Sequence, residues 1–475
     1  MQKIKIETTY KKTLSDIYTP VSIYLRLRDK FRDTVLLESA DYGSAENSRS
    51  IIGINAIGGI EVKDLGAIEF KYPNRKPEKM NVPNHLDVPD LLWAYMLQYD
   101  VQPADNKLVK FAQGLFGYCS YNAVQFFDTI TINHANNEPD REVPLMRYRL
   151  YQYVIVINHF KNEMFICENK INGLESEMSI VETLINNKDV PAFPFALDGK
   201  EISNKTDEEH LAMIGKGIKS CLRGDVFQIV LGRRFQQKFT GDDFNVYRAL
   251  RSINPSPYLF YFDYGDYKLL GSSPESQLII SGGKAIVHPI AGTYKKTGDE
   301  ETDKKAGEAL LKDEKEIAEH TMLVDLARND LSRSCENVRV NYFKQIHSFS
   351  HVMHIVSEVS GDVKQGVNPF ILLANTFPAG TLSGAPKFKA MQLIDEYEHD
   401  SRSYYAGTIG FAGFDGSFVH AIMIRTFLSK NNTLYYQAGG GIVAKSNPAN
   451  ELQEVHNKLG ALKQALVVAA SLNPS

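Results

Sequence analysis

Several features that define particular protein classes are scarce or missing in this sequence of 475 residues. The four cysteines lie far apart and form no C-x-x-C pair: Cys119, Cys167, Cys221 and Cys335. This pattern argues against a zinc cage and a disulfide framework, and it is typical of a reducing compartment. No run of eighteen apolar residues occurs, and the N-terminal residues lack the apolar core of a signal peptide. We therefore expect a cytoplasmic protein with no membrane partner.

Charge is not biased toward either sign. The chain has 53 Lys and Arg against 57 Asp and Glu, spread along its length, and its net charge is -4. The basic cluster that marks a nucleic-acid-binding or membrane-surface protein is missing. We expect small molecules and other proteins as partners, and no nucleic acid.

The length predicts more than one structural unit. A chain of this size exceeds what a single hydrophobic core usually supports, so one large or two interlocked domains are expected. Residues 186–209 are polar and contain two prolines and a glycine, which is typical of a linker between helices. We predict an N-terminal domain at residues 1–195 and a second domain at residues 205–470.

Local patterns predict both strands and helices. Residues 151–158 are rich in aromatic and β-branched side chains, and residues 261–270 and 278–290 resemble antiparallel hairpins. Helical spacing of apolar residues occurs at Lys304–Ala327 and Glu451–Leu466. Together these patterns predict an α+β fold with antiparallel sheet.

Two pairs of glutamates lie in the predicted helices, Glu316 with Glu319 and Glu451 with Glu454. Side chains three residues apart on a helix are neighbours, so each pair can present its oxygens in one direction. Oxygen ligands suit a hard divalent cation such as Mg²⁺. Two solvated acidic helix faces would show the same spacing, so spacing alone leaves both interpretations open.

An ordered series of motifs lies between residues 254 and 460: NPSPYLFY (254–261), GSSPES (271–276), PIAGT (289–293), EIAEHTMLVDLARNDL (316–331), FSHVMH (349–354), GTLSGAPK (380–387), YYAGTIGF (404–411), IRT (424–426) and QAGGGIV (437–443). In this order the motifs resemble the catalytic region of the chorismate-utilising enzymes, specifically the anthranilate synthase component I family. The resemblance implies two interlocked domains in an α/β sandwich, with antiparallel β-sheets packed face to face and helices outside. It also implies a Mg²⁺-dependent lyase that converts chorismate and ammonia to anthranilate and pyruvate, the first committed step of tryptophan biosynthesis.

The resemblance also implies roles for individual residues at a chorismate site. Glu319 and Glu454 are the expected direct Mg²⁺ ligands, and Glu316 and Glu451 would reach the ion directly or through water. The expected contacts of the two substrate carboxylates are Gly292 and Thr293 for the ring carboxylate, and Tyr405, Arg425, Gly439, Gly440 and Gly441 for the enolpyruvyl end. The expected catalytic residues are His354, as general acid for the departing C4 hydroxyl, Thr381, which bonds the substrate, and Glu275, which manages protons on the attacking ammonia.

These positions have structural alternatives when the residues are considered alone. Arg425 is also compatible with a surface arginine at the end of an apolar strand, and the three glycines at 439–441 with an ordinary glycine-rich turn. His354 lies in a strand-like segment, where most histidines are structural, and Glu275 is equally compatible with a carboxylate in a turn.

Two positions distinguish the related reactions of the family. Aminodeoxychorismate synthases carry a lysine nucleophile in the PIxGT motif, where this chain has Ala291. Isochorismate-forming and salicylate-forming relatives carry a lysine that activates water at the position of Gln228, and a neutral amide cannot act as that base. The residues therefore favour ammonia as the nucleophile.

The ammonia is expected to come from a separate glutamine amidotransferase subunit, component II, in a hetero-oligomer. The nearest match to a glutaminase motif surrounds Cys119, but it lacks the final glycine, so Cys119 is interpreted as a small buried residue. Aminodeoxychorismate synthase component I and a non-catalytic sensor of chorismate or tryptophan remain alternative functions.

A feedback site for tryptophan is implied by the LLESAD segment at residues 36–41 together with the NPSPYLFY motif. In this hypothesis Glu38 pairs with the ammonium group of tryptophan, and the 1–195 domain is regulatory. The expected inhibitor-binding residues are Glu38, Ser39, Arg49, Pro257, Tyr258 and Leu259. An ordinary junction of strand and turn would explain the same segments.

Overall fold

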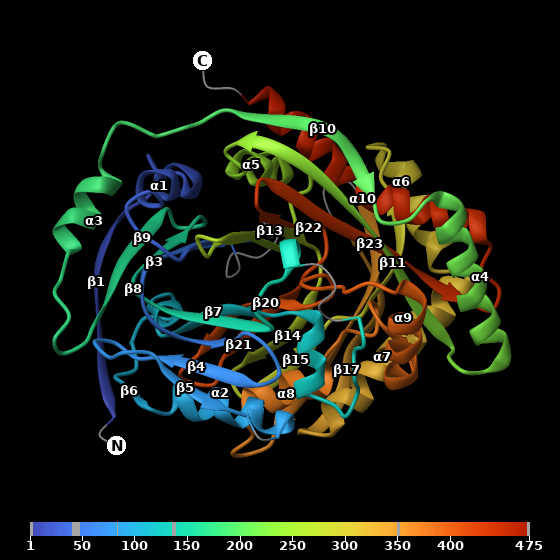
Figure 1. The fold of residues 1–475 in the computed structure, drawn as a ribbon, viewed down its shortest axis with the longest axis horizontal. Coiled ribbons are helices and arrows are strands. Elements are labelled where there is room, and N and C mark those ends of the chain that lie inside the picture. Colours follow the sequence, from blue (N-terminus) through green and yellow to red (C-terminus); the bar gives the residue numbers. More distant parts are fainter. Residues whose placement is uncertain (1–2, 40–47, 83, 135–138, 349–351, 473–475) are drawn as a thin grey trace.

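The computed structural model describes residues 3–39, 48–82, 84–134, 139–348 and 352–472. Its strands form a long series that folds back on itself, and the helices lie mainly on the outside of the two strand layers (Figure 1). The neighbouring strands pair antiparallel, except that β1 and β6 pair in parallel. The predicted α+β class with large antiparallel sheets is confirmed.

The first half of the strand series has a continuous order of hydrogen-bonded neighbours. In that order the strands are β10 (Phe195–Ser203), β11 (Gln228–Gly241), β23 (Thr433–Val443), β22 (Thr426–Lys430), β13 (Tyr267–Ser273), β12 (Tyr258–Asp263), β2 (Thr34–Glu38) and β3 (Arg49–Val62). Helices α10 (Pro448–Ser471), α5 (Phe244–Ile253), α4 (Asp207–Arg223) and α9 (Lys387–Glu398) pack against this half.

The second half begins where β3 pairs with β8. In order its strands are β8 (Met146–Asn158), β7 (Gly114–Cys119), β20 (Thr408–Gly413), β21 (Phe418–Ile422), β14 (Ser276–Ser281), β15 (Lys284–Val287), β18 (Val352–Val363) and β17 (Cys335–Ser348). Helices α7 (Glu314–Ser332), α8 (Pro369–Thr376) and α2 (Val88–Met96) cover it.

The remaining elements extend the edges and loops. They are β1 (Ile4–Leu14), β4 (Ala67–Lys71), β5 (Glu78–Asn81), β6 (Tyr99–Val101), β9 (Glu163–Lys170), β16 (Ile290–Lys295), β19 (Gly384–Ala385), α1 (Pro20–Leu27), α3 (Met178–Ile185) and α6 (Glu300–Leu310). Strands of the N-terminal and C-terminal parts alternate in the series, since β2 pairs with β12 and β7 pairs with β20. The boundary between domains at 1–195 and 205–470 stays a prediction.

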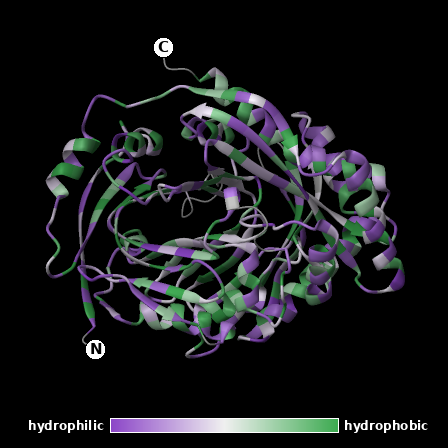
Figure 2. Ribbon diagram, in the orientation of Figure 1, coloured by the Kyte–Doolittle hydropathy of each residue, from purple (hydrophilic) through white to green (hydrophobic). Residues whose placement is uncertain are grey.

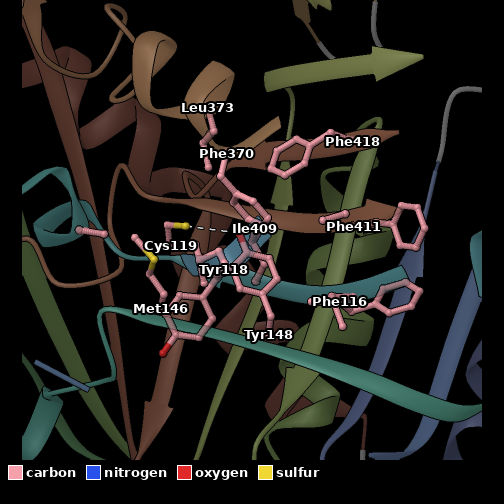
Figure 3. Packing of buried hydrophobic residues seen from close by; sticks show 14 of the residues in the cluster. Phe116, Tyr118, Cys119, Met146, Tyr148, Phe370, Leu373, Ile409, Phe411 and Phe418 are labelled. Carbon is pink, nitrogen blue, oxygen red and sulfur yellow. Dashed lines mark hydrogen bonds between the residues drawn. The ribbon is translucent and has the colours of Figure 1, made fainter. Parts of the chain in front are cut away.

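Buried aromatic side chains cover both faces of the second half of the series. Figure 3 shows Phe116 and Phe411 from neighbouring strands, with Tyr148 facing Phe370 of α8. Each such ring contributes roughly 1.5–3 kcal/mol by leaving water. Cys119 is fully buried here, its Sγ lies 3.3 Å from the Tyr148 hydroxyl, and burial raises the pKa of its thiol to about 12. A reactive thiolate is thereby excluded at this position.

Hydropathy follows the layers, because apolar residues lie along the strands and inner helix faces while polar residues occupy the outer faces (Figure 2). No helix among the described residues is long and apolar enough to cross a membrane.

Two local predictions were wrong. The expected linker at 186–209 contains β10, which pairs with β11, although almost all its side chains are exposed. An exposed edge strand leaves no hydrophobic pattern in the sequence. The expected helix at Lys304–Ala327 is two helices, because Asp313 caps the start of α7 by accepting from the N–H groups of Lys315 and Glu316.

Candidate functional site

The predicted metal ligands lie on the first turns of two helices. Asp313 caps α7 and Asn447 caps α10, which fixes the backbone just before Glu316 and Glu451. Glu319 and Glu454 follow one turn later on the same faces. The two pairs face each other, since the charges of Glu316 and Glu319 both interact with that of Glu454.

Lysine and amide groups contact these carboxylates in the described arrangement. Gln228 Nε2 donates to Glu319 Oε1 at 2.8 Å, and Lys458 Nζ lies 2.6 Å from Glu454 Oε1. Burial raises the pKa of Glu319, and it would also raise that of Glu454, whose pKa is nevertheless lowered because the Lys458 ammonium is so close.

The donor set fits a hard divalent cation. Within the described ranges no group of three acidic, histidine or cysteine side chains is already arranged as a ligand shell. However, Glu451 is 2% exposed and its Oε2 is buried without a hydrogen-bond partner among the described residues. A buried, unpaired carboxylate oxygen is costly unless a cation or donor reaches it. Lys315 Nζ lies 3.5 Å from the other oxygen, Oε1.

The PIAGT motif (289–293) places its backbone next to the glutamate cluster, because β16 contains a β-bulge. The register of β16 against β18 shifts between Ala291 and Thr293, and Gly292 has φ +64°. A side chain there would be strained, and its Cβ would lie 3.2 Å from Glu316 Oε2. Glycine therefore allows the backbone to approach the carboxylates, and Thr293 pairs in register with His354.

His354 hydrogen-bonds to the bulge, and its pKa is shifted from the ordinary value of a histidine. Its Nδ1 donates to the carbonyl of Gly292 at 2.8 Å in the tautomer protonated on Nδ1. Burial, with the charges of Arg425 and Lys458, lowers the pKa of His354 to about 4. This shift favours the neutral ring near neutral pH, and the role of His354 as general acid stays a prediction.

Glu275 has the opposite shift. It lies immediately before β14, and burial raises the pKa of its carboxyl to about 8 despite a hydrogen bond of 3.0 Å from the Thr381 hydroxyl. A carboxyl of this kind is protonated at neutral pH and can donate a proton. Glu275 is thus a further candidate, beside His354, to protonate a leaving hydroxyl.

Arg425 lies between β21 and β22 rather than within one apolar strand, and its φ is +51°. It is only partly exposed, and its guanidinium makes no hydrogen bond or ion pair with any described residue. The charge interacts with Tyr405, Glu275 and Glu454. An unpaired arginine fork in this position is suited to a ligand carboxylate.

The glycines at 439–441 lie within strand β23, which excludes the alternative of an ordinary glycine-rich turn, and their role in substrate binding stays a prediction. Two of them leave no room for a side chain. A Cβ on Gly441 would lie 2.6 Å from Gln228 Nε2, and one on Gly439 would lie 3.0 Å from the Leu231 carbonyl. The Gly439 backbone hydrogen-bonds to the buried hydroxyl of Tyr405.

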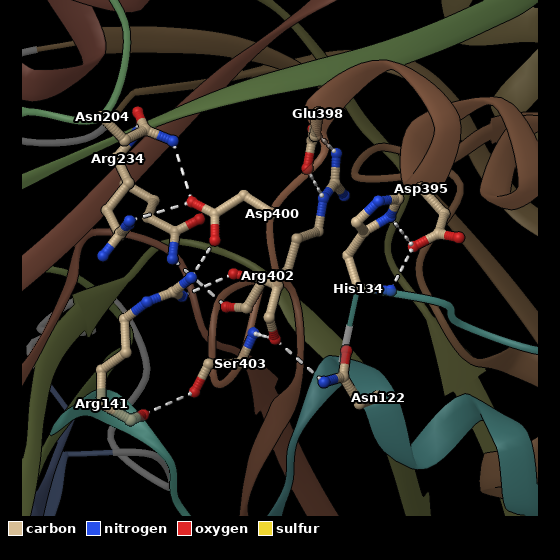
Figure 4. Close-up of polar contacts among 12 residues, drawn as sticks. Asn122, His134, Arg141, Asn204, Arg234, Asp395, Glu398, Asp400, Arg402 and Ser403 are labelled. Atoms are coloured by element: carbon tan, nitrogen blue, oxygen red, sulfur yellow. Dashed lines mark hydrogen bonds and ion pairs between the residues drawn. The ribbon is translucent and has the colours of Figure 1, made fainter. Parts of the chain in front are cut away.

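The loop before Tyr405 is held by a buried polar network (Figure 4). Arg402 donates to both oxygens of Glu398, at 2.9 and 2.6 Å, and to the carbonyls of Leu382 and Val230, both at 2.7 Å. Nearby, Asp400 bridges Arg141 and Arg234. Such fully paired charges rigidify a site, and Arg402 lies 5.7 Å from the Tyr405 ring centre.

Two residues at the site were missed from the sequence. Lys458 contacts Glu454 and donates to the Gly439 carbonyl at 3.0 Å, and Lys315 contacts Glu451. The spacing of Lys458 four residues after Glu454 was an available signal, because such residues share a helix face. No comparable signal existed for Lys315, which meets its partner across two helices.

The expected inhibitor residues come from adjacent strands. Glu38 of β2 pairs in register with Leu259 of β12, and Pro257 and Tyr258 precede Leu259 at partly buried positions. The Ser39 N–H donates to the Arg49 carbonyl at 3.0 Å. The Arg49 guanidinium lies over the ring of Phe111 at 4.3 Å.

Comparison with known proteins assigns the chain to a protein family. A model of the chorismate-binding enzyme family matches residues 78–464. The chain belongs to this family. Anthranilate synthase component 1 of Aquifex aeolicus (strain VF5) is 38% identical over 97% of this chain and 94% of that protein. Its counterpart in Thermus thermophilus is 35% identical over 97% and 98%.

Solved structures agree. Anthranilate synthase component I from Streptococcus pneumoniae TIGR4 matches with a TM-score of 0.74 and 30% identity, over 95% of this chain and 99% of that chain. The menaquinone-specific isochorismate synthase of Escherichia coli matches with a TM-score of 0.73 at 18% identity, over 98% and 96%, which shows the shared fold alone. The resemblance to chorismate-utilising enzymes is confirmed.

Proposed function

We propose that this chain is the large subunit of an anthranilate synthase, a lyase that converts chorismate and ammonia to anthranilate and pyruvate. The observation that carries the proposal is the similarity over almost the whole chain to proteins named anthranilate synthase component 1. Two residues of the site also support the proposal. Ala291 stands where related enzymes carry a lysine nucleophile, and Gln228 stands where others carry a lysine base.

In the proposed site, Glu319 and Glu454 hold Mg²⁺ with Glu316 and Glu451 in support. When bound, the ion supplies Lewis-acid polarisation of the ring carboxylate. Arg425, with Tyr405 and the backbone at 439–441, binds the enolpyruvyl carboxylate, and the backbone of Gly292 and Thr293 lies at the ring carboxylate.

Glu275 is the proposed proton carrier. Ammonia adds at C2 of the ring, and the C4 hydroxyl leaves as water after it takes a proton. The Glu275 carboxyl can give this proton and then accept one from the new ammonium, which returns it to its neutral form. Neutral His354 orients the Gly292 backbone, and Thr381 holds Glu275. Loss of the C2 proton and cleavage of the bond between C3 and the ether oxygen then give the aromatic ring of anthranilate, and the enolpyruvate released takes up a proton on its methylene carbon to become pyruvate.

Regulation and assembly complete the proposal. A separate component II amidotransferase supplies ammonia in a cytoplasmic hetero-oligomer. Tryptophan binds at Glu38, Ser39, Arg49, Pro257, Tyr258 and Leu259. The 1–195 segment acts as a regulatory domain and 205–470 as the catalytic domain.

The decisive experiment uses the pure chain with chorismate, Mg²⁺ and either ammonium chloride or glutamine. We expect anthranilate fluorescence with ammonium and none with glutamine. Aminodeoxychorismate as the product would favour aminodeoxychorismate synthase component I. Binding of chorismate without turnover in either mixture would favour a sensor.

A further inference from the structure

A small cavity lies beside Glu275, and its lining does not include the residues expected to hold the substrate carboxylates. Its volume is about 40 Å³, and its walls come from β14, the C-terminal half of α7 and residues 376–381. Of the residues assigned to chorismate, catalysis or the metal, its lining includes Glu275 and Thr381. These two residues therefore belong both to the cavity lining and to the proposed chorismate site.

Gln277 is directed into this cavity by an irregularity in the sheet. Ser276 pairs with Ala421 and Leu278 pairs with His420, so Gln277 is the extra residue of a β-bulge. Bulges turn a side chain away from the regular alternation of a strand. Gln277 lines the cavity and is 2% exposed.

The orientation of the Gln277 amide is fixed by its surroundings. Its Nε2 donates to the carbonyl of Thr376 at 2.9 Å. The reverse orientation would place two oxygens against each other, so the carbonyl oxygen must point the other way. That Oε1 atom is buried and has no hydrogen-bond partner among the described residues. A buried acceptor without a donor costs about 1–3 kcal/mol.

The other polar groups at the cavity include donors as well as acceptors, because the raised pKa of Glu275 leaves its carboxyl protonated at neutral pH and the Ser276 hydroxyl, 3.3 Å from His288 Nδ1, can donate or accept. The Thr381 hydroxyl already donates to Glu275, and Lys387 already donates to Asp330 at 2.6 Å and to the Thr376 carbonyl at 2.8 Å. The carboxyl groups of Glu275 and Asp330 remain on the lining. The volume suits a ligand of about the size of water, which needs two to four polar partners. Water and ammonia both fit this set of partners, and ammonia is the one that the proposed reaction consumes.

We propose that this cavity is an ammonia-binding chamber, in which Gln277 Oε1 accepts a hydrogen bond from ammonia beside Glu275. The proposal rests on the proposed function, because it concerns the second substrate of that reaction. Gln277 is a positioning residue, since it holds the nucleophile next to the proton carrier and forms no bond in the reaction.

The test compares Gln277→Met with Gln237→Met, which removes another buried glutamine, one that bonds only backbone carbonyls far from this cavity. Initial rates are measured over a range of ammonium chloride at saturating chorismate. We expect Gln277→Met to raise KM for ammonium about tenfold, with kcat and KM for chorismate within twofold. Ala327→Leu, which fills the cavity, should act in the same direction. Unchanged KM for ammonium in both variants would overturn the chamber and leave it as a site for ordered water.

A binding measurement separates this proposal from the proposed function. Ammonium chloride should raise the unfolding temperature of the wild-type chain more than tetramethylammonium chloride at equal ionic strength, because the methylated ion is too large for the cavity. Gln277→Met should abolish the difference. Equal effects of the two salts on the wild type would overturn the chamber, whereas absence of anthranilate would reject only the proposed reaction.

Discussion

Arg251 holds both carboxylate oxygens of Glu38, with Nε to Oε1 at 2.8 Å and Nη2 to Oε2 at 3.0 Å. Tyr247 donates to the same Oε1 at 2.7 Å. The side chain of Glu38 is 3% exposed, whereas that of Arg251 is 37% exposed. Glu38 is also the proposed partner of the tryptophan ammonium, so the inhibitor must displace or share a guanidinium that can move into solvent.

This relationship predicts that Glu38→Gln relieves inhibition. The neutral amide loses the charge that attracts the ammonium, so the Kd for tryptophan should rise at least about tenfold, while turnover without inhibitor stays near that of the wild type. Calorimetric titration of tryptophan, with and without chorismate, measures both the affinity and its coupling to the substrate. Glu61→Gln, which breaks the ion pairs with Arg147 and Arg149, is the control. Unchanged tryptophan affinity in Glu38→Gln would place the inhibitor elsewhere.

The pKa of Glu275 predicts a dependence of stability on pH. The folded chain keeps this proton up to a pKa of about 8, whereas the unfolded chain loses it near 4.5. The stabilisation is therefore present below pH 4.5 and is lost as pH rises toward 8, by about 1.4 kcal/mol per pH unit at most. Thermal unfolding of Glu275→Gln and wild type from pH 5 to 8 should show the variant gaining relative stability as pH rises. A constant difference would contradict the shift, and Glu275→Gln should also lose turnover.

A substitution at Thr381 provides a second test of the Glu275 carboxyl. Its hydroxyl donates to Glu275 and lowers the pKa of the carboxyl, so Thr381→Val should move the pH window upward. The pH profile of kcat for ammonia-dependent turnover measures this movement. A profile identical to that of the wild type would remove Glu275 as the proton carrier.

The sequence predicted the elements whose patterns are local. The antiparallel hairpin of β12 and β13, expected at residues 261–270, follows from the glycine and aspartate residues of its turn. The strand β10 escaped prediction because its outward residues are polar, and its pairing with β11 is decided by a partner distant in sequence.

At the site, the motifs predicted residue identities but not their protonation or exact backbone. His354 and Glu275 lie in the expected motifs, yet the direction of each pKa shift depends on burial by segments far apart in the chain. For the glycines at 439–441 the sequence left a turn open as an alternative, and they lie in a strand because their pairing with β11 decides the conformation. Nothing in the sequence singled out Gln277, because its bulge depends on the register in which β14 pairs with β21.

The position of Lys315 predicts that its ammonium group competes with Mg²⁺ for the carboxylates of the site. Its ammonium lies 3.5 Å from Glu451 Oε1 and interacts with the charges of Glu316, Glu319 and Glu454. Two charges at this distance repel or attract by about 1 kcal/mol in water, which corresponds to about fivefold in affinity. Lys315→Met should therefore lower the Kd for Mg²⁺ about fivefold in calorimetric titration, while the exposed Lys312→Met leaves it unchanged. Weaker Mg²⁺ binding in Lys315→Met would instead assign the lysine to holding the site together.

The position of Arg425 predicts that its loss stabilises the free chain and weakens substrate binding. Its partly buried guanidinium makes no hydrogen bond or ion pair with the described residues, so its desolvation is uncompensated until a carboxylate arrives. Arg425→Met should raise the unfolding temperature of the free chain, yet raise KM for chorismate on the order of 10- to 100-fold. Arg328→Met, which breaks only the exposed pair with Asp325, is the control and should change neither quantity appreciably. Differential scanning calorimetry and initial rates measure the two effects on the same preparations. A less stable Arg425→Met protein with unchanged KM would mean that the arginine supports the fold between β21 and β22 and does not bind the substrate.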